Sequence, residues 1–249
     1  MRRDREEPQG GNSDSMARLV LFDIDGTLVL TGGAGIRAMT RAGQDLLGVT
    51  ALLDGVEVAG RTDWIILRDA LRNLGRDIEP ALFTRLRDAY LAYLREEILA
   101  PGEGTKAVMP GVRELLAALQ PIDGVWIGLL TGNFAEGARI KLEHFDLWRY
   151  FRGGAFGDDA ADRNALVPYA VGRACASGFA AVPYNDVLVI GDTPHDVACA
   201  HAVGATPIGV ATGSYTASQL VAAGAEIVFD DLGDTNALVR LIGVGRRAG

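Results

Sequence analysis

Short uninterrupted apolar runs alternate with stretches of helical periodicity along most of the chain. Runs rich in Val, Leu and Ile, without polar alternation, are typical of strands buried on both faces of a parallel sheet. The clearest runs cover residues 19–22, 125–130 and 186–190, and shorter ones cover 155–156, 207–211 and 227–229. Helices are expected between them at residues 112–119, 135–144, 166–177 and 194–203. Because strand and helix alternate, we expect a doubly wound parallel sheet with right-handed crossovers.

Only helical periodicity occurs between the first two clear strands. Apolar residues recur at helical spacing in residues 36–47, in a segment that begins at Asp63, and in another that begins at Pro80. Asp63 is expected to cap its helix, and Pro80 suits a first helical turn. Residues 28–35, which include two adjacent glycines, are expected to form a flexible exit from the first strand. An all-helical segment at this place in a parallel sheet indicates an inserted cap domain.

These patterns divide the chain into three parts. Residues 1–15 are charged and nearly without apolar side chains, so a disordered arm is expected, because such a segment cannot bury enough surface to offset its ordering entropy. Residues 16–34 and 102–249 are expected to form a Rossmann-like α/β core. Residues 35–101 are expected to form a helical cap domain.

Composition narrows the classes of partner. The chain has 249 residues, 49% of them hydrophobic, and a formal net charge of −8. An acidic protein lacks the basic face that nucleic-acid backbones require, but a local site can still bind a small phosphorylated substrate. No apolar run is long enough to cross a membrane, and no signal-peptide core is seen. Cys175 and Cys199 have neither metal-ligand nor disulfide spacing, so a reducing, cytoplasmic location is expected.

Polar turns follow the three clearest strands. Asp23 and Asp25 end the first, Thr131-Gly132-Asn133 ends the second, and Asp192 and Asp196 follow the third. Because ligands of open α/β sheets bind at the carboxyl ends of the strands, we expect these side chains to meet at one edge. Neighbouring carboxylates repel each other unless a cation or a shared proton intervenes. The sequence therefore predicts a Mg²⁺ site that binds a phosphorylated ligand.

The string Asp23-Ile24-Asp25-Gly26-Thr27 resembles motif I of the haloacid dehalogenase superfamily, a family of mostly phosphate-ester hydrolases. Thr131 resembles motif II, and Gly191-Asp192 with Asp196 resembles motif IV. The resemblance covers residues 18 to about 241, and the helical segment lies where the family places its first cap type. The phosphoglycolate phosphatase and β-phosphoglucomutase subgroup is the most similar. The resemblance implies a Mg²⁺-dependent phosphatase that hydrolyses a small phosphorylated metabolite through an aspartyl-phosphate.

The same resemblance implies a role for each residue of these motifs. Asp23 would attack phosphorus, and Asp25 would protonate the leaving oxygen and then deprotonate water. The Thr131-Gly132-Asn133 turn would bind phosphoryl oxygens. Mg²⁺ would be held by Asp23, the Asp25 carbonyl and Asp192. Asp25 also separates the chain from the dehalogenase and phosphonate-cleaving branches, which by resemblance lack this carboxylate.

A third motif of the family is a Lys or Arg that neutralises the nucleophile and the phosphate. The usual Lys-Pro pair is missing here, and Arg163 stands in its place just ahead of a helix. Lys141 is the alternative, but it falls about 10 Å along the preceding helix, where a solvated helix face is expected. We therefore expect Arg163 to be this cation. Asp196 could join the metal site, support a neighbouring side chain, or complement its own helix N-terminus.

Some alternatives stay open from sequence. Arg61 in the helical segment could meet an anionic leaving group, or it could belong to a helix-capping turn. A phosphomutase would share every motif above, and a non-catalytic regulatory protein could retain the same fold. A dinucleotide-binding module is disfavoured, because no Gly-x-Gly-x-x-Gly follows the first strand.

Overall fold

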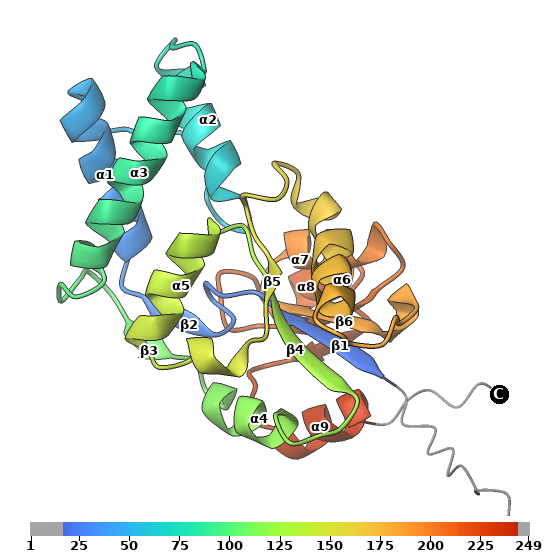
Figure 1. The fold of residues 1–249 in the computed structure, drawn as a ribbon. Coiled ribbons are helices and arrows are strands. Elements are labelled where there is room, and N and C mark those ends of the chain that lie inside the picture. Colours follow the sequence, from blue (N-terminus) through green and yellow to red (C-terminus); the bar gives the residue numbers. More distant parts are fainter. Residues whose placement is uncertain (1–16, 244–249) are drawn as a thin grey trace, which may run out of the picture.

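The core is a parallel sheet of six strands, which confirms the predicted doubly wound α/β fold (Figure 1). The computed structural model describes residues 17–243, so the arm expected at residues 1–15 lies outside the described residues. The strand order is β5-β4-β1-β6-β7-β8, and every neighbouring pair is parallel. The strands are β1 (Arg18–Phe22), β4 (Val125–Leu130), β5 (Gly154–Ala155), β6 (Val187–Gly191), β7 (Thr206–Val210) and β8 (Ile227–Phe229).

Helices cover both faces of the sheet, which explains the unbroken apolar runs of the strands. Val20 and Phe22 of β1 pack on one face, and Leu19 and Leu21 pack on the other. The first face is covered by α4 (Val112–Leu119), α5 (Ala135–His144) and α9 (Thr235–Gly243). The second is covered by α6 (Leu166–Ala176) and α7 (Pro194–His201), and α8 (Ala217–Ala222) packs beside α7. Helices α8 and α9 were not predicted from the sequence.

A small antiparallel pair connects the core with the helical segment. The exit expected to be flexible at residues 28–35 contains β2 (Val29–Thr31), which pairs with β3 (Lys106–Val108). Three residues are too few to show a periodicity, so this strand is visible only through its partner, far along the chain. The pair joins the segments that enter and leave the helices, and it therefore fixes where the helical segment sits over the sheet edge.

Three helices form a separate bundle above the sheet, here called the helical insert: α1 (Ala34–Leu47), α2 (Asp63–Asn73) and α3 (Pro80–Glu97) (Figure 1). The insert has its own apolar core, which also takes in Phe134 and Ile140 from the start and middle of α5. The N-cap of α2 is Thr62, whose Oγ1 accepts a hydrogen bond from the Ile65 N–H at 3.2 Å. The expectation that Asp63 caps this helix was wrong, because Asp63 falls one residue inside it.

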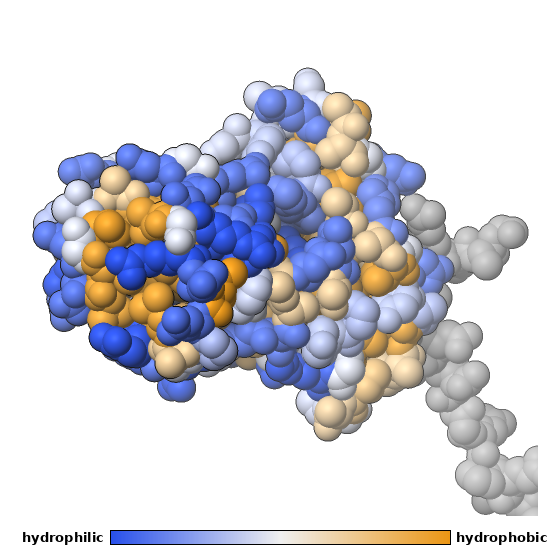
Figure 2. Space-filling view, turned by 90° about the horizontal axis from the view of Figure 1, so that it is seen from above, coloured by the Kyte–Doolittle hydropathy of each residue, from blue (hydrophilic) through white to orange (hydrophobic). Residues whose placement is uncertain are grey.

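The surface of the insert is mixed. Viewed from above, apolar side chains gather over the part of the molecule that carries α1–α3, with strongly hydrophilic ones between them (Figure 2). Within residues 17–243, no helix combines the length and the apolar character needed to cross a membrane. The cytoplasmic location stays a prediction.

Candidate active site

The sheet brings the three predicted polar turns to one edge. Strands β4, β1 and β6 are adjacent and parallel, with Phe22 paired to Leu129 on one side and to Ile190 on the other. The Asp23 N–H, one residue beyond β1, donates to the Ile190 carbonyl at 2.9 Å. Residues that follow these strands therefore share one site, as expected for an open α/β sheet.

Two glycines let the backbone approach Asp192 closely. Gly26 has a φ of 85°, and a Cβ there would overlap the Asp192 carboxylate. A Cβ at Gly213 would overlap the same carboxylate. Asp192 is further fixed by Thr27, whose Oγ1 donates to its Oδ1 at 2.9 Å. The carboxylate thus sits in a cradle that larger residues at either glycine would fill.

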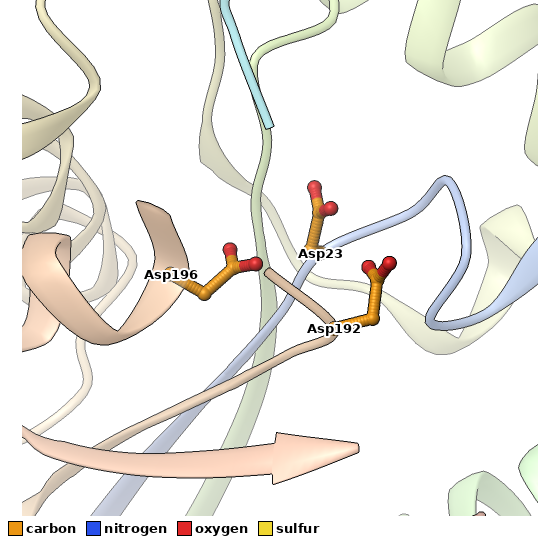
Figure 3. A group of neighbouring side chains, drawn as sticks. All are labelled: Asp23, Asp192 and Asp196. Carbon is orange, nitrogen blue, oxygen red and sulfur yellow. The ribbon is translucent and has the colours of Figure 1, made fainter. Parts of the chain in front are cut away.

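Three buried carboxylates converge at this edge (Figure 3). Asp23, Asp192 and Asp196 each offer an oxygen, and these oxygens all lie within 4.8 Å of one another. Burial raises the pKa of Asp23 to about 6 against the opposing charge of Arg163. Burial raises the pKa of Asp192 to about 8, and the neighbouring Asp23 carboxylate adds to this. Buried oxygens that repel one another in this way fit a hard divalent cation, which removes the repulsion.

Asp196 is held mainly by protein partners. Its Oδ2 accepts from the Thr193 N–H at 3.0 Å and from Thr193 Oγ1 at 2.8 Å, and its Oδ1 accepts from Arg163. Both oxygens are therefore engaged, one in capping α7 and one in holding Arg163. These contacts agree with two of the possibilities left open by the sequence, support of a neighbouring side chain and stabilisation of the N-terminus of its own helix.

Arg163 lies directly against Asp23. It begins the 3₁₀ turn Arg163–Ala165, it is buried, and its Nη2 is 3.0 Å from Asp23 Oδ1. Burial lowers the pKa of Arg163, but the Asp196 and Asp23 carboxylates more than compensate and hold it above its ordinary value. Among the described residues its Nε has no hydrogen-bond partner. The guanidinium is thus a fixed cation beside the carboxylate at the end of β1.

Lys141 is not on a solvated face, and that expectation was wrong. Only 5% of the residue is exposed. The reason lies in the position of α5, which is packed between two cores: Leu142 belongs to the sheet core and Ile140 to the core of the insert. Because helix α5 is covered on both of these sides, the Lys141 side chain does not reach solvent, and its ammonium points into the site.

The Lys141 ammonium pairs with the second carboxylate at the end of β1. Nζ lies 2.8 and 2.6 Å from the two Asp25 oxygens and 2.6 Å from Asn133 Oδ1. The Asn133 Nδ2 donates to Asp25 Oδ2 at 2.8 Å and to Thr131 Oγ1 at 2.7 Å. The Asn133 amide is therefore committed to protein partners, and its role in phosphate binding stays a prediction. The two candidate cations serve different carboxylates, Arg163 at Asp23 and Lys141 at Asp25.

The helical insert is bonded to the turn after β4. The Asp63 N–H donates to the Gly132 carbonyl at 2.7 Å, and Asp63 Oδ2 accepts from the Phe134 N–H at 2.9 Å. The Tyr90 hydroxyl also donates to Asp63, at 3.3 Å. Burial raises the pKa of Asp63 to about 6, although the Lys141 charge opposes this. Sequence reasoning missed Asp63 and Tyr90, because no spacing along the chain links them to residues 132–134.

One cavity joins these groups. It has a volume of about 460 Å³ and is lined both by residues of the sheet edge and by residues of the insert. Arg61 lies on its wall, but the guanidinium pairs with Glu57 at 3.1 Å and with Asp69 at 3.0 Å. The lining includes eight of the nine site residues expected from the sequence: Asp23, Asp25, Arg61, Thr131, Gly132, Asn133, Arg163 and Asp192. The ninth, Asp196, is not part of the lining but contacts Arg163, which is.

Comparisons with known proteins identify the family. A family model described as haloacid dehalogenase-like hydrolase matches residues 20–201. A protein named "Probable phosphatase IndB" from Dickeya dadantii is 31% identical over 231 residues, which cover 91% of this chain and 96% of that protein. A phosphoglycolate phosphatase from Rhodospirillum rubrum is 32% identical over 227 residues, covering 88% and 90%. The crystal structure of CbbY from Rhodobacter sphaeroides with phosphate shares the fold, with a TM-score of 0.67 at 22% identity over 88% of this chain and 96% of that one.

Proposed function

The chain belongs to the haloacid dehalogenase-like hydrolase family, and we propose that it is a Mg²⁺-dependent phosphatase that hydrolyses a phosphoric monoester of a small metabolite. One observation carries the proposal: two carboxylates at the end of one strand occupy different environments. Asp23 is buried in the carboxylate cluster beside Arg163, whereas the Asp25 side chain is 44% exposed and lies outside the cluster beside Lys141. Carboxylates in such different surroundings are suited to different chemical tasks.

In the first half of the reaction, an Asp23 oxygen attacks phosphorus. The new bond gives an aspartyl-phosphate, and the bond to the alcohol oxygen breaks. Asp25 supplies the proton that this oxygen needs to leave as a neutral alcohol. Arg163 keeps Asp23 in its anionic, nucleophilic form and offers positive charge to the phosphoryl oxygens. Thr131 and the backbone N–H groups at the start of α5 bind the same oxygens.

In the second half, water replaces the alcohol. Asp25, now ionised, takes a proton from water, whose oxygen attacks phosphorus and releases Asp23 and inorganic phosphate. Lys141 and Asn133 hold the Asp25 carboxylate in one orientation, and Asp196 holds Arg163. The residues that do not touch the substrate thus position those that do.

The oxygen atoms available at this edge of the sheet also suit Mg²⁺. Asp23, Asp192 and the Asp25 backbone carbonyl would hold Mg²⁺, which prefers oxygen ligands and often shares its shell with substrate phosphate. When bound, the ion supplies positive charge that screens the repulsion between an anionic phosphate and the Asp23 carboxylate. The raised pKa values of Asp23 and Asp192 fit this role, because burial disfavours their charged forms and the charge of a bound cation would offset that cost.

The helical insert is proposed to act as a cap over the reaction centre. Two sets of bonds hold it against the phosphate end of the cavity: Thr62 Oγ1 donates to the Ala161 carbonyl, in the segment after β5, at 3.0 Å, and Asp63 is bonded to residues 132–134 in the turn after β4. A closed cap keeps bulk water from the aspartyl-phosphate and contributes residues that contact the alcohol.

Phosphate release from a generic aryl phosphate tests the proposal. Wild type and Asp23→Asn are compared, each with Mg²⁺ and with a chelator, after circular dichroism has shown that the variant is folded. Release that requires the metal and is lost in the variant supports the proposal. Release that persists in Asp23→Asn would remove Asp23 as the nucleophile. If folded, Mg²⁺-loaded wild type releases no phosphate from any monoester, the phosphatase function fails, and sugar bisphosphates would then test a mutase.

A further inference from the structure

The end of the cavity that faces the helical insert is mostly apolar. Ile36 and Met39 of α1, Ile66 of α2, Val58 of the connecting segment and Leu30 of β2 all line it. Ile36 remains 45% exposed although it is a large aliphatic side chain. These side chains come from the insert, its connecting segment and β2, whereas the groups proposed to bind phosphate come from the edge of the main sheet, so we place them against the alcohol portion of a bound monoester.

The cations on this wall are already paired. Arg61 is bound by Glu57 and Asp69, and Lys141 is bound by Asp25. Asp63 adds a further buried carboxylate, so that acidic side chains outnumber basic ones. Within residues 17–243, this end of the cavity therefore offers no unpaired cation to an anionic alcohol. A second carboxylate or phosphate there would lose part of its hydration without gaining a counter-charge, which is unfavourable.

Neutral polar groups are also few at this end. Among the lining residues that come from α1–α3, β2 and the segment between α1 and α2, only Tyr90 and Thr31 carry a side-chain hydroxyl, and that of Tyr90 is used by Asp63. The other hydroxyl side chains of the cavity, Thr131, Thr193, Thr212 and Ser214, come from segments that follow strands of the sheet. A sugar would bring several hydroxyl groups into contact with aliphatic side chains and leave them without partners. The cavity volume of about 460 Å³ is ample for an alcohol larger than a two-carbon unit.

From this combination we infer that the preferred substrates are phosphate monoesters of uncharged, apolar alcohols. The inference rests on the proposed phosphatase function and specifies its substrate class. Phosphoglycolate, which is named for the relative from Rhodospirillum rubrum, carries a carboxylate and lies outside this class.

A series of straight-chain alkyl phosphates measures the apolar contribution. Their alcohols differ in length but hardly in acidity, so a trend in kcat/KM reports binding of the chain. Burial of each added methylene should raise kcat/KM about fourfold until the cavity is filled. A flat series from ethyl to butyl phosphate would overturn the inference.

A matched pair of esters measures the effect of charge. Isobutyl phosphate has the same arrangement of heavy atoms as phosphoglycolate, with two methyl groups in place of the carboxylate oxygens. Wild type should hydrolyse isobutyl phosphate with a kcat/KM at least about tenfold higher than that for phosphoglycolate. Equal values, or a preference for phosphoglycolate, would overturn the inference while leaving the phosphatase function intact. Failure to hydrolyse any monoester would instead refute the phosphatase function on which the inference rests.

Ile36→Lys places a cation on the apolar wall at a position that already tolerates partial exposure. It should lower the preference for isobutyl phosphate over phosphoglycolate by about tenfold or more. Leu99→Lys is the matched control, because Leu99 is 74% exposed and does not line the cavity. This control should keep the wild-type preference. An unchanged preference in Ile36→Lys, with the variant folded, would show that this wall does not contact the alcohol.

Discussion

Replacing Lys141 by Met tests whether the buried ammonium positions Asp25 for proton transfer. The ammonium contacts both Asp25 oxygens, at 2.8 and 2.6 Å, and the Asn133 Oδ1 at 2.6 Å. Met keeps an unbranched side chain of similar length, so the packing of α5 between its two cores should be retained. The substitution therefore removes the charge and leaves the shape largely unchanged.

The structure sets the size of the effect. Hydrogen bonds to charged groups contribute about 1.5–3 kcal/mol, but the Asp25 side chain is 44% exposed and solvent screens the pair. We expect Lys141→Met to lower the free energy of unfolding by about 1–2 kcal/mol. A well-placed general acid accelerates reactions by about 10²–10⁴-fold, and Asn133 still restrains Asp25 in the variant. The expected loss in kcat/KM for an alkyl ester is therefore about 10- to 100-fold.

The assay compares two leaving groups. An alkyl alcohol needs a proton to depart, whereas a dinitrophenolate does not, so its kcat/KM should fall by less than about threefold. Because kcat/KM reports only steps up to release of the alcohol, the later hydrolysis does not enter. Lys141→Arg should retain most of the activity, and Arg139→Met removes an exposed cation from the same helix as a control. Equal losses for both esters would refute a positioning role, because a general loss of folding or binding affects the two alike.

Two further predictions concern Arg163 and Asp63. Arg163→Ala should raise the inhibition constant of inorganic phosphate at least about tenfold, and by more than Lys141→Met does. The reason is that Arg163, and not Lys141, contacts Asp23. A larger effect of Lys141→Met would exchange the roles of the two cations. Burial raises the pKa of Asp63 from 3.8 to about 6, so the folded protein binds this proton more tightly, and the contribution of Asp63 to stability falls as pH rises from about 4 to 6. The unfolding free energy of Asp63→Asn minus that of wild type should therefore rise by about 1–3 kcal/mol between pH 4 and pH 7. Urea unfolding at several pH values measures this, and a pH-independent difference would contradict it.

The strands of the core and their polar turns were predictable because their signals are local. In β1, β4 and β6 the apolar run and the turn that follows it are contiguous, so a few residues specify both the strand and the group that it delivers. An unbroken apolar run by itself indicates that both faces of the strand are buried. Asp23, Asp25, Thr131 and Asp192 could be located in this way before any contact was known.

The contacts between distant segments could not be predicted. The burial of Lys141 depends on the helical insert covering α5, and the chain around residue 141 carries no sign of that cover. The same holds for the bond from Phe134 to Asp63 and for the pairing of β2 with β3. Arg61 shows a related difficulty, since only the structure shows that Glu57 and Asp69 already neutralise its charge. The sequence shows which ionisable and polar side chains are present, whereas the tertiary packing determines which partners each of them contacts.

Direct detection of the covalent intermediate tests the central claim most sharply. Wild type, Asp25→Asn and Asp23→Asn would be mixed with an aryl phosphate and Mg²⁺, quenched in acid within the first turnover, digested, and mapped by mass spectrometry. The account predicts one phosphoryl group on the peptide that contains Asp23, which accumulates in Asp25→Asn because hydrolysis lacks its base, and which is absent from Asp23→Asn. A phosphoryl group on another residue, or turnover by Asp23→Asn without any labelled peptide, would contradict it.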